Sequence, residues 1–304
     1  MEQQTQVAKR GIDVLKSVMN APSIQEQFKN ALNENSGAFV ASVIDLYNSD
    51  NSLQRCDPKA VVMEALKAAV LKLPINKALG FAYIVCFNNN VKQANGSWMK
   101  VPTPTFMPGY KGYIQLAMRT GSYRTINADI VYEGEVNKVN KLSGEINFDG
   151  EKISDKVIGY FCYFELLNGF KKTFYSTVEE MAKHAKRFSP GLKGDAKVTV
   201  ESLIKLSNTS LESSAVGWTG NFSDMALKTT IRHLLSKYGY LSIEMQSMIS
   251  NDESQTTRDK EIDDTDIKNI DITDVDFLPV TLNGNEGKEN AFDAAAPKQE
   301  DLPY

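Results

Sequence analysis

The sequence predicts a fold of mixed helices and strands, followed by a carboxyl-terminal tail of different composition. Some segments have apolar residues at every third or fourth position, as in a helix, and others are short runs of β-branched and aromatic residues, as in strands. An Asn-Gly pair at 168–169 joins two such runs and signals an antiparallel hairpin. The chain has 304 residues, 42% hydrophobic and 24% charged, which is enough for a core and about two domains.

Six segments carry helical patterning. Asp57 is a candidate cap of one helix, a Thr-x-x-Glu capping box over 177–180 begins another, and Ser223 is the expected cap of the last. Gly37 is a candidate interruption of the first helix, and Gly121 closes the third. The segments are residues 23–47, 58–71, 108–119, 177–188, a stretch within 199–214, and 222–238.

The strand patterns lie between these helices. The run 157–167 is almost continuously apolar, so we expect this strand to be buried on both faces. The Asn-Gly pair that follows it is typical of a type I′ turn. Strands are predicted over 81–87, 123–135, 157–167 and 170–175, with turn and loop over 92–104 and 191–197 and polar turns or a hairpin over 136–155.

Charge divides the chain into two unequal parts. Residues 1–240 hold 29 Lys and Arg against 22 Asp and Glu, whereas residues 241–304 hold 5 against 16. A basic body favours a polyanionic partner, although a solvated body with a solubility tail is an equally natural interpretation. Because aromatic residues nearly vanish beyond Met248, we expect a folded domain over 1–248 and a disordered acidic tail over 249–304.

The sequence lacks the residues and motifs that several functional classes of protein require. Cys56, Cys86 and Cys162 show no metal-binding spacing and suit a reducing cytoplasm. His184 and His233 are the only histidines, so zinc sites and Ser/His/Asp catalysis are disfavoured. The longest apolar run is short for a membrane span, the first residues do not resemble a secretory signal, and no P-loop pattern occurs. We therefore expect a cytoplasmic protein that is not an enzyme and uses no cofactor or metal.

Cations interleaved with flat side chains point to single-stranded nucleic acid, since phosphates need positive charge and unstacked bases need a surface to stack on. The alternative is that the aromatic residues belong to the core and the cations to an ordinary surface. The candidate DNA-binding residues are Tyr110, Lys111, Tyr113, Arg119 and Arg124 with Tyr123 nearby; Lys183, Lys186, Arg187, Phe188, Lys193 and Lys197; and Trp218, Lys228 and Arg232.

Other chemistries remain as alternatives. A two-metal nuclease needs clustered acids, and Asp129, Glu133 and Glu135 are the one group of that kind; we interpret them as hairpin surface. His184 is expected to bond to a phosphate or to the backbone, or to be a half-buried side chain, and not to act as a catalytic base. A single-strand binder that does not anneal, or an RNA-binding module, would share the charge and the aromatic residues.

Four stretches resemble the RecT-type phage single-strand annealing proteins, which are related in role to the lambda Red beta protein. The stretch Gly109-Tyr110-Lys111-Gly112-Tyr113-Ile114-Gln115-Leu116-Ala117 is the most specific of the four. Cys86 stands where the family pattern leads us to expect proline. The resemblance spans about residues 60–245 and rests on segments 73–85, 108–121, 179–189 and 218–232.

The resemblance implies an α+β core in which a small central antiparallel β-sheet and a long helix line a basic DNA groove, flanked by amino- and carboxyl-terminal helices. It also implies a prophage protein that binds single-stranded DNA and anneals it to a complementary strand without ATP. Members work as a homo-oligomer, a ring or a helical filament, beside a companion phage exonuclease and the host single-stranded-DNA-binding protein. The chain end, residues 299–304, is similar to the acidic, Pro-aromatic tip of such host proteins.

Overall fold

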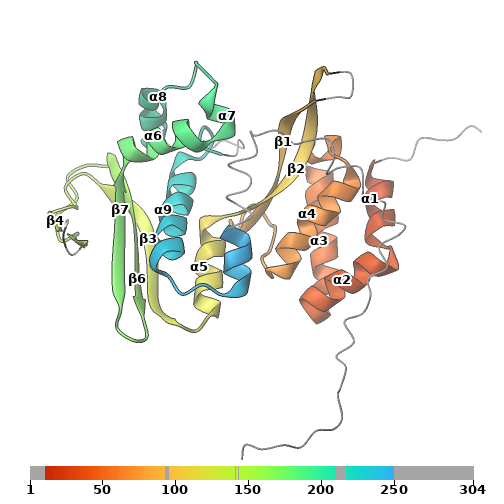
Figure 1. Cartoon of the computed structure of the whole chain (residues 1–304), viewed down its shortest axis with the longest axis horizontal. Helices are drawn as coiled ribbons and strands as arrows, with labels where there is room; N and C mark the ends of the chain where they lie inside the picture. Colours follow the sequence, from red (N-terminus) through yellow and green to blue (C-terminus); the bar gives the residue numbers. More distant parts are fainter. Residues whose placement is uncertain (1–10, 93–95, 141, 143, 210–216, 250–304) are drawn as a thin grey trace, which may run out of the picture. The chain divides into compact units, whose positions relative to one another are not determined.

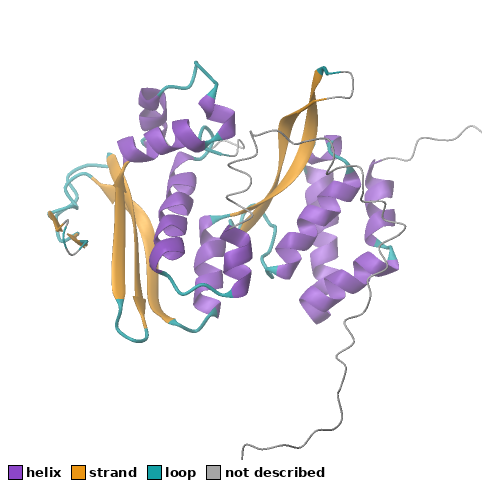
Figure 2. Cartoon of the chain, in the orientation of Figure 1, coloured by secondary structure: helices purple, strands orange, loops and turns teal. Residues whose placement is uncertain are grey.

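The computed structural model describes residues 11–92, 96–140, 142, 144–209 and 217–249. These residues all fall within one compact unit, Met1–Glu261. The predicted tail, apart from its first residue, lies outside the described residues. The fold is mixed α/β with small antiparallel sheets (Figures 1 and 2).

The amino-terminal part is helical. The segment predicted as one helix over 23–47 is two, and the break lies at Asn33, not at Gly37, which is inside the second helix. Asn33 has a φ of 51°, a conformation that asparagine tolerates better than most residues. The elements are α1 (Gly11–Met19), α2 (Pro22–Leu32), η1 (Asn33–Asn35), α3 (Ser36–Ser49), η2 (Leu53–Arg55) and α4 (Pro58–Val70).

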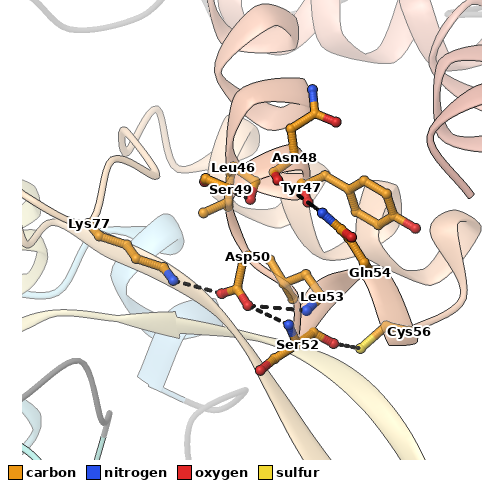
Figure 3. A network of polar contacts seen from close by, with 10 residues as sticks. All are labelled: Leu46, Tyr47, Asn48, Ser49, Asp50, Ser52, Leu53, Gln54, Cys56 and Lys77. Atoms are coloured by element: carbon orange, nitrogen blue, oxygen red, sulfur yellow. Dashed lines mark hydrogen bonds and ion pairs between the residues drawn. The ribbon is translucent and has the colours of Figure 1, made fainter.

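Asp57 caps α4 as predicted, its carboxylate accepting a hydrogen bond from the Lys59 backbone N–H at 3.2 Å. The loop before α4 is held by a second aspartate (Figure 3). Asp50 accepts hydrogen bonds from the Ser52 and Leu53 backbone N–H groups at 2.8 and 3.3 Å. It also pairs with Lys77 at 2.6 Å. This network ties the end of α3 to the segment that leads into the first strand.

The first two strands form a ribbon that the sequence predicted only in part. Strand β1 (Ala82–Lys92) pairs along its whole length with β2 (Trp98–Pro108). The prediction of turn and loop over 92–104 was therefore wrong for most of that range. The prediction rested partly on Pro102 and Pro104. Each strand of a two-stranded ribbon is an edge strand, however, and proline is tolerated there.

A three-stranded antiparallel sheet follows, in the order β3-β6-β7. A small hairpin of two further strands lies within 136–155, as one of the two expectations had it. The strands are β3 (Tyr123–Tyr132), β4 (Lys138–Asn140), β5 (Glu145–Asn147), β6 (Val157–Leu166) and β7 (Lys171–Thr177).

Two expectations for the β6–β7 hairpin were wrong. A type I′ turn needs positive φ at both central residues, yet of the two turn residues Asn168 and Gly169 only the glycine has one, at 84°. The Gly169 N–H bonds to the Leu166 carbonyl at 3.0 Å, as in a three-residue loop with a bulge. Strand β6 is fully buried on one face alone: Tyr160 and Phe164 are 0% exposed, while Tyr163 on the other face is half-buried.

The remaining helices surround this sheet. The capping box at Thr177 and Glu180 is confirmed, but the cap of the last helix is Asn221 and not Ser223, whose hydroxyl lies 3.2 Å from that of Tyr160. The helices are α5 (Tyr110–Arg119), α6 (Val178–Phe188), α7 (Pro190–Lys193), which occupies part of the predicted loop, α8 (Val200–Ser207) and α9 (Phe222–Tyr238). Residues 243–249 are also helical.

Buried residues form two clusters. One joins the amino-terminal helices, α5, the inner face of the sheet and the second half of α9. The other joins α6, α8 and the first half of α9 through residues such as Met181, Leu203 and Phe222. Helix α9, whose place in the fold is labelled in Figure 1, therefore contributes residues to both clusters. No helix within the described ranges is long and apolar enough to cross a membrane.

Candidate nucleic-acid interface

Helix α6 presents one apolar face and one charged face, which is acidic in the first turn, where Glu179 pairs with Lys183, and basic in the last. Met181, Ala182 and Ala185 are buried, whereas Lys183 and Arg187 are exposed. The Arg187 guanidinium lies 5.1 Å from the centre of the Phe188 ring, and this ring is 44% exposed. A cation beside an accessible flat ring is the pair of groups that a nucleotide needs, one for its phosphate and one for its base.

Lys186 has a different position from its neighbours. Its ammonium donates to the backbone carbonyl oxygens of Leu192 and Asp195, at 2.7 and 2.6 Å. These bonds hold the segment after α6 against the helix. Lys193 and Lys197 on this segment are both exposed. Lys186 thus orders a loop that presents two other cations.

His184 lies where the second and third groups of predicted residues meet. Its ring centre is 4.7 Å from that of Phe188 and 6.4 Å from that of Trp218. Burial, and then the charges of Arg232 and His233 on α9, lower the pKa of His184 below its ordinary value. The imidazole is therefore neutral at neutral pH. We call the accessible groups here the α6–α9 surface: Lys183, Arg187, Phe188, Lys193, Lys197 and Arg232.

Several predicted residues are placed where nucleic acid cannot reach them. Tyr113 is 0% exposed, and Trp218 and Lys228 are each 7% exposed. Trp218 packs edge-on against Phe222 with ring centres 5.2 Å apart. Tyr123, 5% exposed, donates its hydroxyl to the Tyr240 carbonyl at 2.9 Å. The set of accessible candidate residues is therefore smaller than the set that the sequence predicted.

The glycines of the most specific stretch have a packing role. A Cβ atom on Gly109 would lie 2.1 Å from the Gly80 carbonyl oxygen, and one on Gly112 would lie 2.3 Å from that of Phe81. The start of α5 therefore crosses the backbone before β1 too closely for any side chain. This crossing leaves Lys111 exposed, with its ammonium 5.9 Å from the centre of the half-buried Tyr110 ring.

The cations at the far end of α5 are engaged elsewhere. Arg119 donates to the carbonyl oxygens of Leu71 and Lys72 at 2.8 and 2.9 Å, which satisfies the end of α4. Arg124 forms an ion pair with Glu165 at 2.9 Å, although its side chain is 58% exposed. The structure does not gather these two arginines with the α6–α9 surface.

The acids considered for a two-metal site are dispersed. Glu133 bonds to Ser154 at 2.8 Å and to Lys156 at 3.2 Å, while Glu135 accepts from the Tyr132 backbone N–H at 2.7 Å. Asp129 accepts a hydrogen bond from the Ile130 backbone N–H at 2.7 Å, so each of the three acids has a partner of its own. The interpretation as hairpin surface fits this arrangement.

Sequence reasoning missed a groove on the outer face of the sheet. It has a volume of about 720 Å³ and is lined by residues that include Lys138, Phe161, Tyr163 and Lys171. The alternation of aromatic residues along β6 was a signal that could have indicated it. The ribbon also carries an exposed ring that was overlooked, since Trp98 is 66% exposed.

Comparison with known proteins gives a consistent result. A family model described as the RecT family matches residues 37–266, a range that contains all four resembling stretches. The chain is 39% identical over 293 residues to the uncharacterized protein YqaK of Bacillus subtilis (strain 168), which covers 95% of this chain and 90% of that protein. It is 26% identical over 257 residues to Protein RecT of Escherichia coli (strain K12), covering 82% and 83% of the two chains.

Proposed function

Since the chain belongs to the RecT family, we propose that it binds single-stranded DNA and anneals it to a complementary strand in recombination. The reaction needs no ATP, and the working form is a homo-oligomer, either a ring or a helical filament. The folded domain over 1–248 carries this activity, and the acidic residues over 249–304 form a separate tail.

The α6–α9 surface is the observation that carries the proposal beyond family membership. Annealing requires a protein that holds the phosphates of a strand while its Watson–Crick edges stay free, because pairing must read the sequence. Exposed cations on a helix and a loop can hold phosphates without reading bases. Phe188 adds a ring on which any base can stack.

The proposed contacts are those predicted residues that remain accessible. Lys186 acts as a positioning residue through the loop it holds. Tyr113, Arg119, Trp218 and Lys228 support the fold. The residues proposed to touch DNA are Tyr110, Lys111, Arg124, Lys183, Arg187, Phe188, Lys193, Lys197 and Arg232.

The test is annealing of two complementary, fluorophore-labelled oligonucleotides added to the protein one after the other, with EDTA present and no nucleotide. We expect pairing far faster than the spontaneous rate. If the protein binds both strands but does not accelerate pairing, the second candidate, a single-strand binder that does not anneal, replaces the proposal. Loss of substrate length would indicate a nuclease, and preference for RNA strands an RNA-binding module.

Two partners belong to the proposal. A companion phage exonuclease would supply single strands, and the host single-stranded-DNA-binding protein would occupy them first. Because residues 299–304 are similar to the tip of such host proteins, we propose that they bind the same partners as that tip. Co-purification of the full chain with each candidate partner tests this part separately.

A further inference from the structure

The outer face of the β3-β6-β7 sheet carries a groove that the annealing proposal does not use. The inner face packs against α9, since Cys162 and Phe164 share a buried cluster with Ile231 and Leu234. The β4–β5 hairpin lies over the opposite face and forms one side of the groove. Its volume of about 720 Å³ is within the range of roughly 300–1,000 Å³ typical of ligand sites.

Strand register sets the floor of this groove. Tyr163 on the central strand pairs with Asn127 on one side and Thr173 on the other, which gives a row with one aromatic ring between two short polar groups. Phe161 lies two residues along the same strand and so points to the same face. The two rings are therefore about 7 Å apart along the strand, and Tyr163 is anchored through its hydroxyl, which donates to Glu165 at 3.3 Å.

The hairpin is fixed to the sheet by aromatic packing at one end. Phe148 has its ring centre 4.7 Å from that of Phe161 and 6.3 Å from that of Tyr175. Tyr175 in turn lies so close over Gly159 that a Cβ atom there would be 2.4 Å from the ring. This end is closed, so the accessible part of the groove is the end with Tyr163, Asn127 and Thr173.

The lining of the groove carries three lysines against two acids and is rich in amides. Lys138 on β4 and Lys171 on β7 are both exposed. The two acids are Asp149, which accepts a hydrogen bond from the Asn147 amide at 2.8 Å, and the exposed Glu145 on β5. Cations and amides around a flat ring match the chemistry of a nucleotide chain, whose phosphates are negative and whose bases stack and accept hydrogen bonds.

We propose that this groove is an accessory binding site for single-stranded nucleic acid, separate from the α6–α9 surface. The inference rests on the proposed function, because it assigns the second site to the same class of ligand. The groove lies on the outer face of the sheet, whereas α9, which carries Arg232, packs on the inner face. We therefore infer that one subunit can hold two different strands at once. Holding a second strand nearby raises its effective concentration and shortens the search for complementarity.

A reporter variant tests the site directly. Tyr163→Trp in the full chain adds an indole to the groove floor, and the signal is its fluorescence minus that of wild type during titration with an oligothymidine 30-mer. Stacking of a base should quench this added emission. No quenching at saturating oligonucleotide would overturn the proposal.

Charge reversal gives a second readout that does not depend on the reporter. Lys138→Glu with Lys171→Glu should weaken co-capture of two non-complementary oligonucleotides at least tenfold but leave it measurable, with energy transfer between donor and acceptor labels as the readout. The first strand should bind within twofold of wild type, and the salt slope of the second binding phase should fall by about 1.4, or 0.7 for each lost phosphate contact. The matched control is Lys16→Glu with Lys29→Glu, two exposed lysines on α1 and α2, which should leave co-capture unchanged.

The outcomes separate this inference from the proposed function. If wild type anneals but the reporter is not quenched, the proposed function stands and the proposed groove site is wrong. Quenching and co-capture without accelerated annealing keep the groove and remove the annealing function. If the variant at Lys138 and Lys171 co-captures two strands as well as the control variant at Lys16 and Lys29, the proposed groove site is also wrong.

Discussion

The Lys186 ammonium lies 2.6 Å from the carbonyl oxygen of Asp195, nine residues further along the chain, and bonds to that of Leu192 as well. Lys186, which the sequence predicts to contact DNA, thus stabilises the conformation of the segment after α6. Such charge-assisted bonds stabilise more than neutral ones. The position of a lysine on a basic helix face therefore does not decide its role; its hydrogen-bond partners do.

Replacing Lys186 with methionine keeps the aliphatic stem but removes both bonds. We expect the free energy of unfolding to fall by about 1–2 kcal/mol, measured by urea denaturation. The control is Lys183→Met, one turn earlier, which breaks only a surface ion pair with Glu179 at 2.5 Å. Such pairs contribute about 0–1 kcal/mol. Equal losses in the two variants would contradict the structural role of Lys186.

The α6–α9 surface should govern the salt dependence of DNA binding. Replacing Arg187, Lys193 and Lys197 together with alanine should lower the slope of log affinity against log salt by about 2, since each single-strand phosphate contact contributes about 0.7. Filter binding of an oligothymidine at several salt concentrations measures this. A triple variant of exposed lysines elsewhere, at positions 16, 29 and 59, should keep the wild-type slope. If both variants keep it, these cations do not contact phosphates.

The crossing of α5 over the backbone before β1 makes Gly109 irreplaceable. Gly109→Ala puts a methyl group 2.1 Å from the Gly80 carbonyl oxygen, a contact that the rigid backbone cannot avoid without moving the helix. We expect a loss of several kcal/mol in unfolding free energy, as for severe overpacking. Gly191→Ala is the control, because nothing lies within 4 Å of its Cβ position. A neutral Gly109→Ala variant would contradict the described crossing.

Local signals in the sequence predicted the elements that depend on local chemistry. The caps at Asp57 and Thr177 follow from side chains within three residues of the helix start, and the structure has both. The cap of α9 was misplaced by two residues because Asn221 and Ser223 are both good caps. The tertiary bond of Ser223 with Tyr160, which the sequence does not show, accompanies this choice.

Features set by long-range pairing were harder to predict. The groove exists because Asn127, Tyr163 and Thr173 share a row across three strands, and register is not visible in any one segment. Helical periodicity likewise could not tell whether Tyr113 faces solvent or core. For the candidate site, the sequence indicated the cations on α6 but could not separate Arg187, which is accessible, from Lys186, whose ammonium is bonded to two backbone carbonyl oxygens.

The acidic tail should weaken DNA binding at low salt. Residues 250–304 hold 15 acids and 5 bases, so deleting them removes negative charge that competes with phosphates for the basic body. We expect tighter binding of an oligothymidine at low salt and a difference that disappears at high salt, where charges are screened. A full-length variant with the acids of 252–276 changed to amides is the control for length. Unchanged affinity in both variants would leave the tail as a solubility segment.

The environment of His184 predicts a dependence of stability on pH. Burial is the main cause of its lowered pKa in the folded chain, with Arg232 and His233 adding to it. In the unfolded chain His184 takes up a proton near pH 6.5, whereas in the folded chain it does so only at lower pH. Its contribution to stability is therefore complete above about pH 6.5 and is lost as the pH falls toward the pKa of the folded state. His184→Gln should therefore lose less stability than wild type between pH 7.5 and 5.5, measured by urea denaturation. His233→Gln is the matched comparison, because burial also lowers the pKa of His233 and the charge of Arg232 acts on both imidazoles. We expect the stability of this variant to depend less on pH than that of wild type as well. Profiles that match wild type in both variants would show that folding does not lower the pKa of either histidine.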